Sequence, residues 1–212
     1  LHESNELRLN LGGYVDFNYS QDSRDNLKLK PGFRVQTLAL FFEKMIRSDW
    51  RFFAEIEYED APAFDFRDGA ADTSGKLLLE AVHFDYNAGR QTSVRGGRYY
   101  TPAGIWSDDH YPPNVPTQER PLHLRRIFPQ LIDGLAIHLQ PQWHTGSARF
   151  DVYVGNGEGN ADPGKVDDNS RKSFGGRGSF IPASLPELDL GMSIYSDRRA
   201  DNGQEIRVRG IH

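Results

Sequence analysis

The densest group of chemically competent side chains in this 212-residue chain lies between residues 101 and 129. It contains Trp106-Ser-Asp-Asp-His-Tyr-Pro-Pro and, further on, Arg120-Pro-Leu-His-Leu-Arg-Arg. Because oxygen and imidazole ligands suit zinc or manganese, one hypothesis is a divalent-metal site made by Asp108, Asp109, His110 and His123. No ligand spacing such as His-Glu-x-x-His is present, so a loop held by its own ion pairs is the favoured interpretation. We expect no bound metal and no other cofactor.

A second acidic group, Glu55, Glu57 and Glu59, recurs every second residue and therefore falls on one face of a strand. Two such carboxylates could in principle cleave a glycosidic bond, which needs carboxyl groups roughly 5 to 10 Å apart. A row of charges along a pore explains the same spacing without a reaction. The chain also lacks a Gly-x-Ser-x-Gly elbow, a phosphate loop and a dinucleotide fingerprint. The sequence therefore predicts that the protein is not an enzyme.

Composition excludes several classes of protein. The 30 acidic and 25 basic side chains give a net charge of −5, which argues against a nucleic-acid partner. The absence of cysteine excludes a disulfide scaffold and a thiolate metal site. No run approaches the ~18 consecutive apolar residues of a membrane-spanning helix. A membrane β-barrel stays open, because strands with one apolar and one polar face average to a low hydropathy.

Alternation of apolar and polar residues is the dominant pattern along the chain and indicates β-strands. In the segment from Trp50 to Glu59, for example, apolar residues alternate with Arg51, Glu55, Glu57 and Glu59. The segment 33–46 is less regular, and simple alternation would place Phe33, Val35, Thr37, Ala39 and Phe41 together on one face. We predict about ten strands, near residues 7–19, 33–46, 50–59, 82–87, 91–100, 135–139, 149–154, 174–180, 188–195 and 206–209.

The connections between these strands alternate in length. Long ones fall near 20–31, 60–76, 101–129 and 155–171, short ones near 47–49, 87–90, 144–147 and 182–186, and a medium one over 196–203. Outer-membrane barrels have short periplasmic turns and longer extracellular loops. The sequence thus predicts an all-β protein: one domain over 1–212 that forms a transmembrane, antiparallel, up-and-down β-barrel.

Three segments resemble bacterial outer-membrane porins of the phosphate-selective O/P-type group. They are Leu9-Asn-Leu-Gly-Gly-Tyr-Val-Asp-Phe, Asp49-Trp-Arg-Phe-Phe-Ala-Glu-Ile-Glu-Tyr and Val94-Arg-Gly-Gly-Arg-Tyr-Tyr-Thr-Pro-Ala-Gly-Ile-Trp. The resemblance implies a passive diffusion channel in the outer membrane of a Gram-negative bacterium, usually trimeric, with one loop folded into the lumen. Such a channel is surrounded by lipid bilayer and lipopolysaccharide. Family members are longer and end on an aromatic residue, so we expect this chain to be the amino-terminal part of a longer barrel. A closed ten-stranded barrel is the second choice.

The pore-lining residues follow from this interpretation. By the resemblance, 101–129 is the constriction loop, with Asp108, Asp109, Arg120, Arg125 and Arg126 as candidate charges. Further candidates lie in the polar phase of the strands: Arg8, Arg34, Arg51, Glu55, Glu57, Arg95, Arg149 and Arg177. These arginines either pair with acids across the wall, which is the favoured alternative, or form a ladder that guides anions. The phosphate-selective relatives rely on lysines, whereas this chain has only six, and this departure argues against phosphate itself.

The predicted function is an outer-membrane porin that passes small hydrophilic solutes, anions among them. Two alternatives stay open: a membrane barrel that sheathes a partner protein, and a soluble β-sandwich binding module. Aromatic side chains near the strand ends favour a membrane, because such residues form interfacial girdles. The candidates for such girdles are Tyr14, Tyr19, Trp50, Tyr58 and Tyr86.

Overall fold

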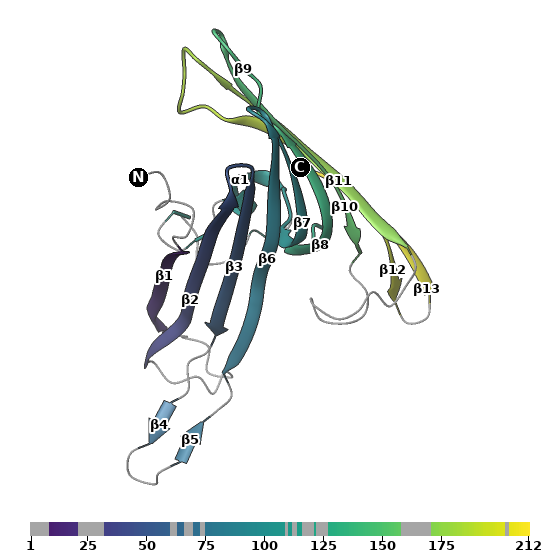
Figure 1. The fold of residues 1–212 in the computed structure, drawn as a ribbon. Helices are drawn as coiled ribbons and strands as arrows, with labels where there is room; N and C mark the ends of the chain where they lie inside the picture. Colours follow the sequence, from purple (N-terminus) through teal and green to yellow (C-terminus); the bar gives the residue numbers. More distant parts are fainter. Residues whose placement is uncertain are drawn as a thin grey trace, which may run out of the picture.

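The described part of the protein is mostly antiparallel β-sheet (Figure 1). The computed structural model describes residues 9–20, 32–59, 63–65, 70–72, 75–108, 110–111, 114–115, 121, 127–157, 171–201 and 204–212. Ten long strands follow one another: β1 (Leu9–Ser20), β2 (Gly32–Arg47), β3 (Trp50–Glu59), β6 (Lys76–Gly89), β7 (Thr92–Tyr100), β8 (Leu131–Leu139), β10 (Gly146–Asn156), β11 (Lys172–Pro182), β12 (Leu190–Asp201) and β13 (Gln204–Ile211). The short elements are β4 (Ala63–Asp65), β5 (Ala70–Asp72), β9 (Gln142–Trp143) and α1 (Gly104–Asp108).

The long strands pair in sequence order, β1-β2-β3-β6-β7-β8-β10-β11-β12-β13, and β9 adds to β10 to give an 11-stranded sheet. The predicted all-β, up-and-down antiparallel fold with about ten strands is therefore confirmed. The sheet is not closed, because β1 and β13 do not pair with each other. The described strands form this one sheet and the β4–β5 hairpin, rather than the two face-to-face sheets of a sandwich.

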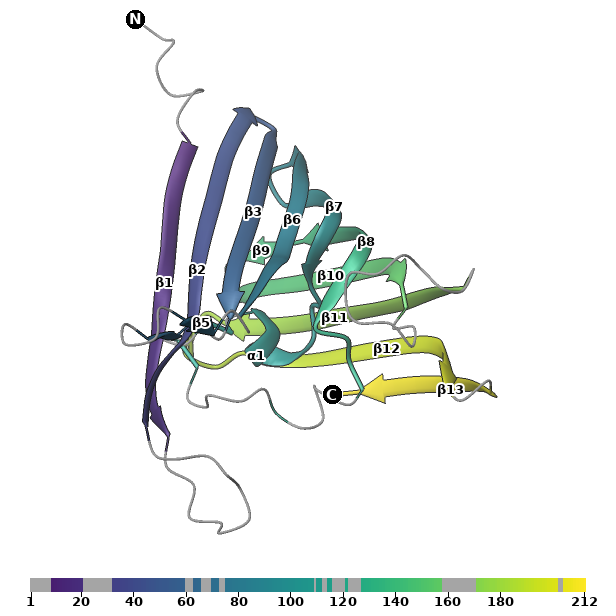
Figure 2. The same cartoon turned by 90° about the horizontal axis from the view of Figure 1, so that it is seen from below.

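The sheet has two chemically different faces. Figure 2 shows it as a curved wall with α1 on the concave side, which we call the inner face. The other, outer face presents apolar side chains to the surroundings, and Leu11, Val152 and Met192 are 67%, 63% and 59% exposed. The inner face carries most of the charge, including Glu55, Asp85 and Asp151, which are at most 5% exposed. This is the polarity that the alternating sequence predicts.

One extra residue in β2 explains its irregular pattern. The register pairs Asp16 with Thr37 but Phe17 with Val35, so Gln36 forms a β-bulge. A bulge shifts the phase of alternation by one residue. Phe33 and Val35 therefore lie on the outer face with Leu38 and Leu40, while Thr37 and Ala39 are buried on the inner face. The prediction that Phe33, Val35, Thr37, Ala39 and Phe41 share a face was wrong for this reason.

A second bulge, in β6, adds a carboxylate to the inner face. Glu55 pairs with Ala81 and Ile56 pairs with Leu79, which leaves Glu80 as the extra residue. Glu80 is buried beside Glu57 and Glu59. Bulges re-aim individual side chains in this way, and simple alternation does not reveal them.

The connections differ in detail from the prediction. The β4–β5 hairpin lies within the expected loop 60–76, and α1 lies within 101–129. The expected medium connection over 196–203 is mostly strand, because β12 continues to Asp201 and its partner β13 begins at Gln204. Figure 1 shows the β4–β5 hairpin at one end of the sheet and β9 at the other. No helix in the described part of the chain is long and apolar enough to cross a membrane.

Two glycines in the segment Val94–Trp106 adopt backbone angles that other residues avoid. Gly97 has φ +131°, and a side chain there would collide with the carbonyl oxygen of Val82. Gly104 has φ +65° and begins α1. Left-handed φ values strain residues that carry a Cβ atom. The glycines therefore set the course of the chain from β7 to α1.

Candidate functional site

Four arginines gather on the inner face, near the short turns. We call Arg51, Arg90, Arg95 and Arg149 the arginine cluster. Three strands bring two of them to one carboxylate, because the register aligns Arg51 of β3 with Asp85 of β6, and Asp85 with Arg95 of β7. Strand geometry thus collects residues that are far apart in the sequence.

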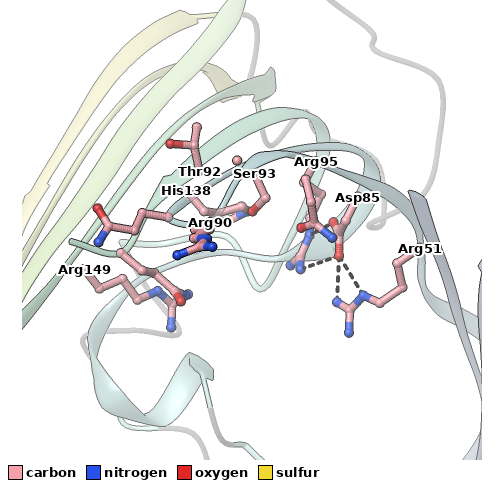
Figure 3. A pocket seen from close by; sticks show the side chains of 12 residues that line it. Arg51, Asp85, Arg90, Thr92, Ser93, Arg95, His138 and Arg149 are labelled. Carbon is pink, nitrogen blue, oxygen red and sulfur yellow. Dashed lines mark hydrogen bonds and ion pairs between the residues drawn. The ribbon is translucent and has the colours of Figure 1, made fainter. Parts of the chain in front are cut away.

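Asp85 is the shared partner of two guanidinium groups (Figure 3). Arg95 donates from Nε to Oδ1 at 2.7 Å and from Nη2 to Oδ2 at 3.1 Å. Arg51 donates from Nε and Nη2 to Oδ2 at 3.0 and 2.6 Å. Such forked contacts fix the plane of each guanidinium group. Asp85 therefore orients both arginines.

Asp151 plays the same role on the neighbouring strands. Nε of Arg149 lies 2.9 Å from Oδ2 of Asp151, and Nδ1 of His138 lies 2.5 Å from Oδ1. Asp151 itself is 1% exposed, whereas the Arg149 side chain is 34% exposed. The acid is thus covered and its arginine reaches the surface.

The arginine cluster lines a cavity of about 390 Å³. Its wall includes the four arginines and His138. Asp85 is the single acidic residue among the described residues that line it. The other lining residues are neutral: Asn87, Gly89, Gln91, Thr92, Ser93 and Gln140. Figure 3 shows Arg90, His138 and Arg149 grouped to one side of the Arg51–Asp85–Arg95 group. A hollow with more cations than anions attracts small anions.

Four carboxylates form a second group on the inner face. We call Glu55, Glu57, Glu59 and Glu80 the glutamate cluster. One oxygen from each of Glu57, Glu59 and Glu80 lies within 4.8 Å of the other two. Tyrosines donate to the cluster: Tyr14 to Glu57 at 3.4 Å and Tyr111 to Glu55 at 3.5 Å. Among the described residues, no lysine or arginine lies within 4.0 Å of these carboxylates.

The chain segment after β7 crosses the inner face. At one end, Gly104 N–H donates to Oγ of Ser193 on β12 at 3.0 Å. At the other end, the ring of Tyr111 packs on Tyr14 and Phe41 of β1 and β2, with ring centroids 5.9 and 5.2 Å apart. The segment thus spans from a late strand to the first strands.

An apolar cluster anchors this segment. Ala103 and Trp106 pack with buried side chains that come from four strands and from the chain just before β8. These side chains are Tyr99, Phe128, Ile132, Ala136, Tyr153 and Tyr195. A buried apolar anchor of this kind gives a long connection one defined position.

The structure places the predicted site residues unevenly. Arg51, Glu55, Glu57, Arg95, Arg149 and Arg177 lie on the inner face as predicted. Arg177 is buried and lies 3.2 Å from Asp189 rather than in the arginine cluster. For Arg34 and Asp108 only the backbone is described, in β2 and at the end of α1. Outside the described residues lie Arg8, Asp109, Arg120, His123, Arg125 and Arg126.

The candidate metal ligands and girdle residues also differ in whether the structure places them where the sequence predicts. His110 stacks on Tyr100 and Tyr111, with ring centroids 3.8 and 4.3 Å apart. It takes no part in the carboxylate group Glu57–Glu59–Glu80, the group of potential ligands within the described residues. The rings of Trp50 and Tyr86 lie next to each other on the outer face, with centroids 5.0 Å apart, and their role in a girdle stays a prediction. Tyr14 was misassigned to the girdle, because its hydroxyl group donates to Glu57 on the inner face.

Sequence reasoning missed two members of these clusters, Arg90 and Glu80, and the cavity-lining His138. Arg90 was assigned to a turn, and nothing in its neighbourhood shows that the turn faces a cavity. Glu80 depends on a bulge. His138 alternates with Ile137 and Leu139, so its inner position was readable from the pattern, but its pairing with Asp151 requires the strand register.

Comparison with known proteins finds sequence similarity to a protein whose name states no function. No family model matches the chain. A protein of Aquifex aeolicus (strain VF5), named only as an uncharacterized protein, is 33% identical over 125 residues, which make up 57% of this chain. The matched part is 26% of that relative, so the chain spans about a quarter of its length.

Proposed function

We propose that this chain forms part of the wall of an outer-membrane porin, a passive channel for small hydrophilic solutes. The observation that carries the proposal is the connection folded onto the inner face, from Ser193 on β12 to Tyr14 on β1. A chain segment that crosses the concave side of a curved sheet narrows any passage along it. The proposal assigns this constriction to 101–129.

The two faces support the same proposal. A barrel in lipid needs an apolar exterior and, as a channel, a polar interior. Exposed Leu11, Val152 and Met192 meet the first condition, and the two charged clusters meet the second. The O/P-type porin resemblance and a trimeric assembly belong to this proposal as well.

The arginine cluster gives the channel a preference for anions. Arginine offers a fixed planar fork to phosphate or carboxylate groups, and the cavity holds four such groups beside one aspartate. Solutes with a small anionic group are therefore the favoured class. The preference comes from arginines already oriented by Asp85 and Asp151.

The test is the reversal potential of the full-length protein in a planar bilayer under a salt gradient. Wild type should conduct with a preference for anions. R90Q/R149Q should reduce that preference by at least about fivefold, since each of the two unit charges acts on an ion at contact in water with about 1 kcal/mol.

The matched control is K44Q/R47Q. Lys44 and Arg47 follow the outer phase of β2, opposite Phe52 and Trp50. They lie at the same end of the sheet as the arginine cluster. K44Q/R47Q should keep the wild-type reversal potential. An equal change in both variants would assign the preference to overall charge, and absence of conductance in wild type would overturn the channel.

A further inference from the structure

Three glutamates from two strands bring their carboxylates together on the inner face. One oxygen from each of Glu57, Glu59 and Glu80 lies within 4.8 Å of the other two, and we call these residues the glutamate trio. Glu57 and Glu59 are two residues apart on β3, and the bulge in β6 turns Glu80 toward them. Spacing along the chain does not reveal the trio, because Glu80 joins it only through this bulge.

Two buried carboxylate oxygens in this region accept no hydrogen bond. They are Oε2 of Glu80 and Oε1 of Glu55. Glu80 is 6% exposed, and Glu55, two residues before Glu57 on β3, is 0% exposed. Burial of a carboxylate oxygen without a partner is unfavourable, and a bound ion is one explanation for such an oxygen in a folded protein. The unpartnered oxygen of Glu80 therefore points to a ligand at the trio.

The basic side chains on the adjoining strand positions do not neutralise the trio. Lys76 lies opposite Glu59 in the strand register but forms no ion pair with it. Arg98 of β7 donates to the carbonyl oxygen of Leu79 at 3.4 Å, yet its Nε and Nη2 donate to Asp133 at 2.7 and 2.8 Å. Within the described part of the chain, the negative charge of the trio is thus left concentrated.

The donor atoms of the trio select the type of cation. All of them are carboxylate oxygens, which suit calcium, magnesium and manganese rather than zinc. Calcium takes roughly six to eight oxygens at about 2.3 to 2.6 Å, so oxygens within 4.8 Å of one another can share one ion. Magnesium usually keeps several waters and binds through one or two carboxylates. Three converging carboxylates therefore favour calcium.

We propose that the glutamate trio binds one calcium ion on the inner face. Glu59 is partly exposed at the end of β3 and gives the ion access to the two more deeply buried carboxylates. The connection after Glu59 carries the β4–β5 hairpin and returns at Lys76, so the ion joins β3 and β6 at the base of this excursion (Figure 1). Calcium thus fastens the root of a long connection, a role that does not depend on conduction.

The test uses the full-length protein in neutral detergent, freed of metal with EDTA, desalted and titrated with calcium chloride in a calorimeter. Wild type should bind one calcium ion at the trio. E57Q/E80Q should weaken that binding step by at least about 100-fold, since loss of a residue that only orients a metal ligand already weakens binding by about 10- to 100-fold. The matched control is D49N/E187Q, which removes two carboxylates from the turns before β3 and β12 and should bind calcium as wild type does.

Unfolding experiments separate loss of the calcium site from loss of the fold. With EDTA present, removal of one carboxylate relieves repulsion, so E59Q should be at least as stable as wild type. With calcium added, wild type should gain stability, because the ion binds the folded state in preference to the unfolded state. E59Q should gain less, because it binds calcium about tenfold more weakly.

Three results would overturn the calcium site. They are the absence of saturable calcium binding to wild type, equal weakening in E57Q/E80Q and D49N/E187Q, and full displacement of calcium by an equal concentration of magnesium. The first is the result expected if the carboxylates share protons or if a basic side chain balances them. None of these measurements involves conduction, so failure of the calcium site and failure of the proposed channel are read from different experiments.

Discussion

The arginine cluster, taken with the Asp85 that orients it, and the glutamate cluster lie on the same face and share β3 and β6, yet they differ in how their charges are paired. Arg51 and Glu55 are four residues apart on β3, and Asp85 and Glu80 are five apart on β6. Each acid that orients the arginine cluster is shared: Asp85 contacts Arg51, Arg95 and His83, and Asp151 contacts Arg149 and His138. In the glutamate cluster the acids meet one another and the hydroxyl groups of tyrosines.

This difference shows that one face of a sheet can carry charged groups that are exposed in a fixed orientation and others that are buried. Shared acids leave part of each guanidinium group exposed in a fixed orientation, as the 34% exposure of the Arg149 side chain shows. Glu55 is fully buried, and the segment that carries Tyr111 covers it. We therefore expect the arginines to govern solute preference and the glutamates to govern how the 101–129 connection sits.

The largest expected effect comes from removing a shared acid. Asp85→Asn takes the charged acceptor from Arg51 and Arg95, and the loss of hydrogen bonds to a charged group should destabilise the protein by about 2 kcal/mol. The anion preference should rise at the same time, because both arginines lose the carboxylate of Asp85, while Arg51 retains its 3.5 Å contact with Glu43. Denaturant unfolding and the reversal potential measure the two effects.

Asp49→Asn is the matched control for this prediction. Asp49 lies in the turn between β2 and β3 and undergoes the same chemical change near the same end of the sheet. Stability equal to that of wild type in both variants would show that Asp85 does not organise the arginines.

The same change in the glutamate cluster should act in the opposite direction. Glu80→Gln removes one of three carboxylates that lie within 4.8 Å of one another. Relief of repulsion between like charges at this distance should stabilise the protein by about 1 kcal/mol. Unfolding of Glu80→Gln is compared with Glu187→Gln, in the exposed turn before β12. A loss of stability in Glu80→Gln would contradict the view that repulsion within the cluster destabilises the fold.

The smallest effect concerns the cover over the glutamate cluster. Tyr111→Phe keeps the ring contacts with Tyr14 and Phe41 and removes one hydrogen bond to Glu55. A single bond of this kind contributes about 0.5 to 1 kcal/mol. Stability should fall by that amount with unchanged single-channel conductance. A large change in conductance would show that the hydroxyl group, rather than the ring, positions the segment.

The fold was predictable because alternation is written in the sequence residue by residue. Trp50 to Glu59 alternates cleanly, and β3 has those bounds. Failures arose where one extra residue breaks the phase. Gln36 reversed the assignment of Phe33 and Val35, and Glu80 joined a cluster that alternation could not assemble. Neither bulge has a composition that distinguishes it from regular strand.

The site was predictable in its residue types and less so in its partners. Arg51, Arg95 and Arg149 were identified from their phase, and the favoured prediction that arginines pair with acids is met by Asp85 and Asp151. Which acid meets which arginine depends on register between strands up to 35 residues apart in sequence, as for Arg98 and Asp133. Periodicity within one strand contains no information on register with the next.

The segment that crosses the inner face also has a consequence for how the chain folds. The contact between Gly104 and Ser193 joins residues 89 positions apart, and Tyr111 contacts Tyr14 from the opposite direction. The middle of the chain thus contacts both an early strand and a late strand, and both can align against it. Each of these two contacts closes a long loop of the chain. Closing long loops is slow, because the conformational entropy of the loop is lost before most of the native contacts form. The same short stretch that would narrow a channel therefore also ties the first strands to a late strand, and we expect assembly of the wall to be slow until both contacts form.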